Sequence, residues 1–135
     1  MGVTGLELLF LEVESLEESL DFYSAGLGFR VVSHEPEAEP PMATLSAGRL
    51  RVMLAQVPLA MARRGRGVHF FLTVDDVDEF HGFLRAGGLD VAPPADEGWG
   101  GRFVTLEDPN HYRLFFVAWH EGGTARGGGA LGLPD

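Results

Sequence analysis

The stretch LLFLEVESLEESLDFYSAGLGFRV at residues 8–31 decides the fold, because it recurs as HFFLTVDDVDEFHGFLRAGGLDV at residues 69–91. Equivalent residues are 61 positions apart, as from Leu8 to His69 and from Val13 to Val74. A duplicated unit of this length is expected to bury one of its faces against its copy. The repeat therefore predicts that a binding site lies between the two copies.

Length and composition bound the class of protein. The chain has 135 residues, of which 45% are hydrophobic, and this is enough for one domain with a core of its own. It has no cysteine, which excludes disulfides, thiolate metal ligands and cysteine nucleophiles. The apolar run at residues 8–11 lies between Glu7 and Glu12, with no basic residue before it. We therefore predict no signal peptide, no membrane span and a cytoplasmic location.

The charge of the chain limits its partners. Twenty acidic residues against ten basic ones give a formal charge of −10. Such a charge repels nucleic acid and anionic membrane surfaces, so we expect neither as a partner. A cationic small molecule would be attracted, although an acidic surface also serves solubility alone.

Each copy of the repeat begins as a strand followed by a helix. The strands are predicted at residues 8–13 and 69–74, from their apolar character and alternation. Ser15 with Glu18, and Asp76 with Glu79, have the spacing of a helix N-cap, in which a side chain accepts a hydrogen bond from a free backbone N–H. Glycines that favour a helix end follow each helix: Gly26, Gly28, Gly87 and Gly88.

Three further strands are predicted after each helix. In the first copy they lie at residues 29–34, 42–46 and 50–56, and in the second at residues 89–92, 102–106 and 112–119. The chain is thus expected to form two βαβββ modules in one domain at residues 1–119. The first module covers about residues 5–57, a linker residues 58–67, and the second module residues 68–119. Residues 120–135 are rich in glycine and poor in apolar residues, which predicts a flexible tail.

Short motifs accompany this pattern. They are Ser19-Leu20-Asp21-Phe22-Tyr23, Leu27-Gly28-Phe29, Val68-His69 with Val74-Asp75-Asp76-Val77, and Trp99-Gly100 with Asp108-Pro109-Asn110. Together with the repeat they resemble the vicinal oxygen chelate superfamily, which includes glyoxalase I, bleomycin-resistance proteins and extradiol dioxygenases. The resemblance covers about residues 5–119. It implies an α+β fold in which paired βαβββ modules form a half-open, barrel-like eight-stranded cup with the helices outside, and it implies a homodimer.

Enzymes of that superfamily hold a divalent metal with one side chain from each of four strands. Carried onto this sequence, those positions fall on Leu8, Met53, His69 and Phe115. Only His69 offers a nitrogen or oxygen donor, and the thioether of Met53 is a poor ligand for zinc, iron, manganese or magnesium. The resemblance therefore predicts no metal site, no other cofactor and no catalytic residue.

Strand alternation from those four positions predicts the side chains that line the cup. The lining set is Leu8, Phe10, Glu12, Arg51, Met53, Ala55, His69, Phe71, Thr73, Arg113, Phe115, Val117 and Trp119, and the alternate set is Leu9, Leu11, Val52, Leu54, Phe70, Leu72, Leu114 and Phe116. Both sets are apolar, so a ligand, the other half of the cup or a second subunit is expected to cover the lining. Trp99 lies among glycines, and in similar proteins a Trp-Gly segment stands at the mouth of the pocket, where an indole can stack on a flat ligand. The candidate ligand-binding residues are Phe10, Arg51, Met53, His69, Phe71, Trp99, Arg102, Arg113 and Phe115.

We interpret the sequence as that of a metal-independent protein that binds and sequesters a small aromatic or cationic molecule, as bleomycin-resistance proteins do, with a role in antibiotic resistance. One alternative is a metal-dependent lyase, isomerase or dioxygenase of the same superfamily that uses His69 with other ligands. Another is an interaction module whose cup is filled by Phe10, Phe71 and Phe115. The sequence does not choose between them.

Overall fold

The structure, a computed structural model, describes residues 2–58, 65, 68–97 and 100–119. Trp99, most of the expected linker and the expected tail lie outside these ranges. The chain divides into two compact units, the first formed by Met1–Arg64 with Asp108–His111 and the second by Gly65–Glu107 with Tyr112–Asp135. The repeat had assigned residues 108–111 to the second module, whereas by their contacts they belong to the first unit.

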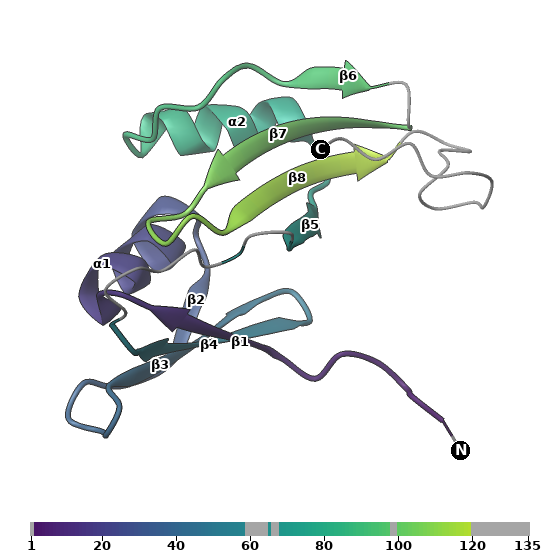
Figure 1. The fold of residues 1–135 in the computed structure, drawn as a ribbon. Coiled ribbons are helices and arrows are strands. Elements are labelled where there is room, and N and C mark those ends of the chain that lie inside the picture. Colours follow the sequence, from purple (N-terminus) through teal and green to yellow (C-terminus); the bar gives the residue numbers. More distant parts are fainter. Residues whose placement is uncertain (1, 59–64, 66–67, 98–99, 120–135) are drawn as a thin grey trace. The chain divides into compact units, whose positions relative to one another are not determined.

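The two units contain the same series of elements (Figure 1). The first unit has β1 (Leu9–Val13), α1 (Leu16–Asp21), a π-helical turn η1 (Phe22–Gly26), β2 (Arg30–Glu35), β3 (Met42–Ala47) and β4 (Leu50–Gln56). The second unit has β5 (His69–Thr73), α2 (Val77–Ala86), β6 (Ala95–Glu97), β7 (Gly101–Glu107) and β8 (Arg113–Trp119).

The sheet topology repeats as well. The first sheet has the order β1-β4-β3-β2 and the second has the order β5-β8-β7-β6. In each sheet the first pair, β1 with β4 or β5 with β8, is parallel and the other pairs are antiparallel. Two four-stranded mixed sheets, each with its helix, confirm the predicted α+β fold of paired βαβββ modules.

The predicted helix caps are present. The side chain of Ser15 accepts a hydrogen bond from the backbone N–H of Glu18, and that of Asp76 accepts one from Glu79. Gly28 and Gly88 follow the helices with φ angles of 84° and 94°, a conformation that other residues adopt at a cost. These caps place the start of both helices where the sequence predicts it. Neither helix is long or apolar enough to cross a membrane.

One predicted strand was wrong. Residues 89–92 form no strand, and β6 begins at Ala95, three residues after the end of the predicted strand. The backbone carbonyl of Val91 lies 3.2 Å from Nε2 of His81 on α2, and the Val91 side chain is buried. The carbonyl of Val91 therefore meets a helix side chain instead of a neighbouring strand.

The core of each unit lies between its sheet and its helix. Leu11, Val52 and Leu54 are buried in the first unit, and Leu114 and Phe116 are buried in the second. α1 packs against β3 and β4, and α2 against β7 and β8. The Phe116 ring lies 4.7 Å from that of Phe80 on α2. These residues belong to the alternate set of β1, β4 and β8, so the opposite faces of the two sheets carry the candidate residues of β1, β4, β5 and β8.

A buried polar cluster holds residues 108–111 in the first unit. The hydroxyl of Tyr23 donates a 2.7 Å hydrogen bond to Asp108, and the amide of Asn110 donates one of 2.9 Å to the hydroxyl of Ser19. The side-chain oxygen of Asn110 accepts a 2.8 Å bond from the backbone N–H of Glu14. The Asp108-Pro109-Asn110 motif is thus the hydrogen-bonding partner of α1 and η1.

Candidate functional site

The second sheet brings four of the candidate residues onto one face. In the parallel pair β5 and β8, His69 lies opposite Arg113 and Phe71 lies opposite Phe115. Directly opposed residues point to the same side of a sheet. Phe115 and its neighbour Phe116 point to opposite sides, and Phe116 contacts α2, so this face is the one turned away from the helix.

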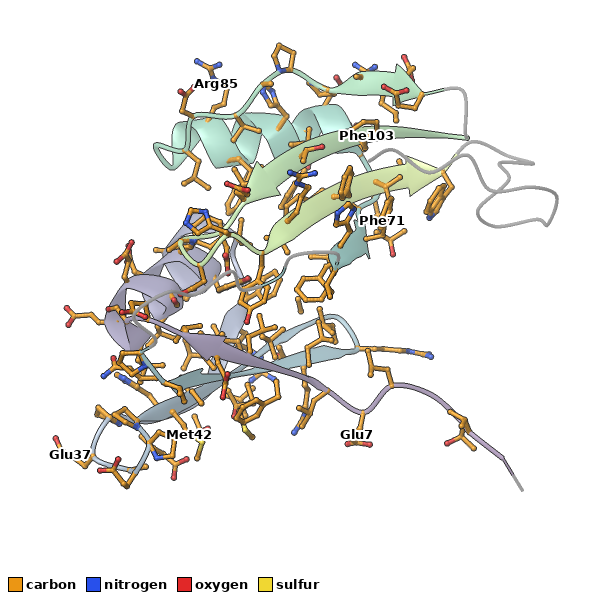
Figure 2. The ribbon with its side chains drawn as sticks, viewed as in Figure 1. Glu7, Glu37, Met42, Phe71, Arg85 and Phe103 are labelled. Atoms are coloured by element: carbon orange, nitrogen blue, oxygen red, sulfur yellow. The ribbon has the colours of Figure 1, made fainter. Side chains whose placement is uncertain are left out.

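Aromatic rings gather on this face, which we call the aromatic face: His69, Phe71, Phe103, Phe115 and Trp119. Phe71 and Phe103 are labelled in Figure 2. The rings of Phe71 and Phe115 are 4.6 Å apart and almost parallel, with an angle of 3° between their planes. Trp119 lies 6.1 Å from Phe71 at 13°, and His69 lies 5.5 Å from Phe115 at 28°. These four rings therefore form one array of roughly parallel planes.

The orientation of the rings determines what they can bind. Phe71 and Phe115 stack across neighbouring strands, at about the 4.8 Å spacing between strands, so their planes stand away from the sheet. Phe115 is buried, whereas Phe71, His69 and Trp119 are half-buried. Because Phe115 covers one face of the half-buried Phe71, the edge of the Phe71 ring, which carries partial positive charge, remains to meet a ligand. A flat, electron-rich ring fits such a surface better than a cation, which needs a free ring face.

The candidate set omitted two members of the aromatic face. Alternation along β8 from Phe115 places Trp119 in the predicted lining of the cup, but the candidate ligand-binding set left it out. Phe103 lies opposite Val117, a register that the sequence does not reveal. A Cβ atom added to Gly101 would lie 2.9 Å from Cγ2 of Val117 and 3.4 Å from the indole of Trp119. A glycine at this position thus leaves room for the Trp119 side chain.

Arg102 lies on the other side of the second sheet. It is opposite Ala118, in the alternate set of β8, and makes ion pairs of 2.8 Å with Asp78 on α2 and 2.9 Å with Asp96 on β6. The hydrogen bond from Arg102 lowers the pKa of Asp78, and the same bond raises the pKa of Arg102. The structure therefore does not bring Arg102 together with Phe71 and Phe115.

The first sheet brings the remaining candidates together. Phe10 lies opposite Met53, and Arg51 is on the same face two residues before Met53. Leu11 and Val52, on the other face, belong to the buried core. We call the side that carries Phe10, Arg51 and Met53 the open face of the first sheet, because Phe10 is 53% exposed. Trp99 lies outside the described residues, and its position is not part of this geometry.

The described residues do not fit a divalent metal. Of the four positions implied by the resemblance, Leu8 and Phe115 have no donor atom and Met53 offers only a thioether. Within the described ranges, no three His, Cys, Asp or Glu side chains lie close enough together to hold an ion. His69 instead stacks on Phe115.

Comparison with known proteins agrees with this architecture. A family model described as the glyoxalase/bleomycin resistance protein/dioxygenase superfamily matches residues 5–116. No curated protein matches the chain significantly. A solved glyoxalase/bleomycin resistance protein/dioxygenase from Nocardioides is similar with a TM-score of 0.74 and 27% identity, over 98% of this chain and 93% of that one.

Two further solved structures are similar. TnmS3, an antibiotic binding protein from Streptomyces sp. CB03234, has a TM-score of 0.69 and 23% identity, over 87% of this chain and 97% of its own. A superfamily member from Sphaerobacter thermophilus DSM 20745 has a TM-score of 0.64 and 25% identity, over 85% of this chain and 97% of its own. At 23% identity, the similarity to TnmS3 concerns the fold.

Proposed function

Because the chain belongs to the glyoxalase/bleomycin resistance protein/dioxygenase superfamily, we propose that it binds and sequesters a small aromatic molecule without a metal ion. The superfamily includes both enzymes and binding proteins, so the choice depends on the residues of the site. The antibiotic-binding TnmS3 has the same fold and supports a resistance role of this kind for the chain.

The aromatic face carries the proposal. Ring stacking contributes about 0.5–1.5 kcal/mol per pair beyond the burial of apolar area. Phe71 and Trp119 are half-buried at this face, so both can meet a ligand. Because the ring planes on the aromatic face are roughly parallel, another planar ring can insert alongside them or contact their edges. These features favour an aromatic ligand over a cationic one.

Phe71→Ala tests the proposal because Phe71 is half-buried, whereas truncation of the buried Phe115 would also damage the core. We expect the variant to bind planar aromatic antibiotics about tenfold more weakly than the wild type, the effect of losing about 1.4 kcal/mol. The measurement is tryptophan fluorescence titrated with a panel of such compounds. Phe83→Ala is the matched control, because Phe83 is 48% exposed and lies on α2. Equal affinities for wild type and Phe71→Ala would contradict the proposal.

Trp99 remains part of the proposed site as a stacking residue. It follows Glu97, the last residue of β6, and precedes β7 on the second sheet. The same titration on Trp99→Ala tests this role, with Trp119 as the remaining fluorophore. Unchanged affinity would remove Trp99 from the site and leave the role of Phe71 standing. We leave Arg102 out of the binding surface, because two carboxylates hold it on the helix side.

The competing function is a metal-dependent enzyme of the superfamily. It would require ligands besides His69 that the described residues do not bring together. Elemental analysis of protein purified without chelator separates the two functions. Stoichiometric zinc, iron, manganese or nickel would favour the enzyme and contradict metal-independent binding.

The proposal includes a homodimer of single-domain chains in the cytoplasm. Support for self-association comes from β2, an edge strand of the first sheet with Val31 and Val32 40% and 42% exposed. Exposed apolar residues on an edge strand favour contact with another chain. Light scattering during gel filtration measures the mass, and a monomer at micromolar concentration would contradict this part. Fractionation of the producing cells checks the location.

A further inference from the structure

Three rows of side chains cross the open face of the first sheet. Residues opposite one another in the β1, β4, β3 and β2 register share a row and a face. The first row is basic and polar, the second is uncharged with an apolar pair at its β1 and β4 end, and the third contains two carboxylates; β2 has a register irregularity between Val31 and Ser33. The rows are Arg51, Ser46 and Arg30; Phe10, Met53, Thr44 and Ser33; and Glu12, Ala55, Met42 and Glu35.

The basic row places two guanidinium groups on either side of a hydroxyl. Arg51 on β4 and Arg30 on β2 flank Ser46 on β3, so their Cα atoms are about 10 Å apart, twice the spacing between strands. Both arginines are exposed, and within the described ranges neither makes an ion pair or a side-chain hydrogen bond. Two long side chains at this separation can converge on one oxyanion, with Ser46 as a third donor.

The second row supplies an apolar surface beside the basic one. Residues two apart in a strand are about 6.6 Å apart, which is the distance between neighbouring rows. Phe10 is 53% exposed and Met53 is half-buried, so both can contact a ring. A thioether against an aromatic ring is a favourable contact. Arg51 and Met53 lie in adjacent rows of the same strand, so an acid group held by Arg51 leaves the aromatic ring that carries it within reach of Met53 and its neighbour Phe10.

The carboxylates of this face lie at its other end. Glu12 and Glu35 are in the third row, about 13 Å from the arginines by strand geometry. This exceeds the Debye length of about 8 Å at physiological salt, so these carboxylates only weakly offset the arginines. The arginine end of the face is therefore locally positive, although the chain has a formal charge of −10.

We propose that the open face of the first sheet binds an aromatic anion, with its acid group between Arg30 and Arg51 and its ring on Phe10 and Met53. The inference rests on the proposed function in that the chain binds a small aromatic molecule, and it assigns anionic members of that class to a surface of the first sheet that is distinct from the aromatic face of the second sheet. The anionic ligand is an aromatic carboxylate, sulfonate or phenolate. It differs from the cationic ligand that the net charge of the chain suggests.

Two fluorescent probes that differ by one sulfonate test this inference. They are 8-anilinonaphthalene-1-sulfonate and its uncharged analogue N-phenyl-1-naphthylamine. Arg30→Gln and Arg51→Gln should each weaken binding of the sulfonate about tenfold, since each removes a charge-assisted hydrogen bond. The uncharged probe should change less than about twofold. Arg85→Gln is the control for net charge, because Arg85 is exposed on α2.

The outcomes separate this inference from the proposed function. Arginine variants that leave sulfonate binding unchanged, or that weaken both probes equally, would overturn the anion site. If the uncharged probe still binds in a manner that depends on Phe71, the proposed function survives that result. Sulfonate binding that depends on both arginines, with no effect of Phe71→Ala on either probe, supports the anion site and counts against the aromatic face. Unchanged circular dichroism of the variants ensures that the probes report binding to the native protein.

Discussion

Arg102 illustrates how the neighbours of one side chain determine what it can do. Its place after the glycines around Trp99 made it a candidate for ligand binding. In the structure its guanidinium contacts Asp78 and Asp96, at 2.8 and 2.9 Å, on the helix side of the sheet. A guanidinium held by two carboxylates fixes α2 and β6 against β7. Arg102 therefore stabilises the local structure. The arginines that bind a ligand are expected on other strands.

The ion pair between Asp78 and Arg102 predicts a pH dependence. The pKa of Asp78 lies below its ordinary value of 3.8 in the folded protein, chiefly because of the hydrogen bond from Arg102. A lowered folded-state pKa stabilises the fold above the unfolded value, and this contribution disappears as the pH falls through the folded value. Asp78→Asn should therefore be less stable than the wild type at pH 7, with the difference vanishing below the folded-state pKa.

Urea unfolding across a pH series measures this difference. The effect should be small, because Asp78 is exposed, Arg102 is only half-buried, and surface ion pairs are screened. Asp90→Asn is a suitable control, because Asp90 is exposed and lies outside the ion pairs of Arg102. A difference between Asp78→Asn and wild type that persists unchanged in acid would show that the ion pair is not its source.

Among the secondary-structure elements, the stability of α2 depends on its N-cap residue, Asp76. Asp76 accepts a hydrogen bond from the backbone N–H of Glu79, which satisfies one donor that the helix leaves free. Asp76→Ala should lower the free energy of unfolding by about 1 kcal/mol, the usual cost of losing such a cap. Asp75→Ala is the adjacent control, because Asp75 precedes the cap. Equal losses for the two variants, measured in urea, would contradict the capping role.

The two units of the molecule are interleaved along the chain, because a segment of the first unit lies between two segments of the second. Asp108–His111 belongs to the first unit, although β7 before it and β8 after it belong to the second. Tyr23 and Ser19 on the first helical segment are each 1% exposed and bond to Asp108 and Asn110. Buried polar groups that lose their partners cost about 1–3 kcal/mol each. The first half of the repeat therefore depends on residues from the second.

This interleaving predicts that the first half does not fold alone. A fragment of residues 1–64 lacks the partners of Tyr23 and Ser19, so it should show no cooperative unfolding transition by circular dichroism. In the full chain, Asn110→Ala should lower the free energy of unfolding by about 1–3 kcal/mol and speed amide exchange in α1. A fragment that unfolds cooperatively, or an Asn110→Ala chain as stable as wild type, would contradict this view.

Regular local patterns made most of the fold predictable. The caps at Ser15 and Asp76 and the alternation of β1, β4, β5 and β8 depend on residues close together in the chain, and the repeat presents such local patterns twice. The predicted strand at residues 89–92 failed because Val91 meets His81 on a helix, a contact that alternation does not describe. The structure likewise placed the candidate residues of the second sheet on two different faces. Phe71 and Phe115 share a face because their strands alternate in the same phase, whereas Arg102 is on the other face because of the β7 register.

The amino-acid pattern thus predicted two βαβββ modules, because alternation and helix capping act over a few residues. It also predicted a set of strand residues that is rich in aromatic side chains and poor in side chains that can ligate a metal. Strand pairing decided the rest: the stack of Phe71 on Phe115, the place of Phe103 beside them, and the row that joins Arg30 to Arg51. Packing also decided that Asp108 and Asn110 belong with the first helix. These features join residues far apart in the chain, and their register depends on turns and side-chain packing that no local pattern encodes.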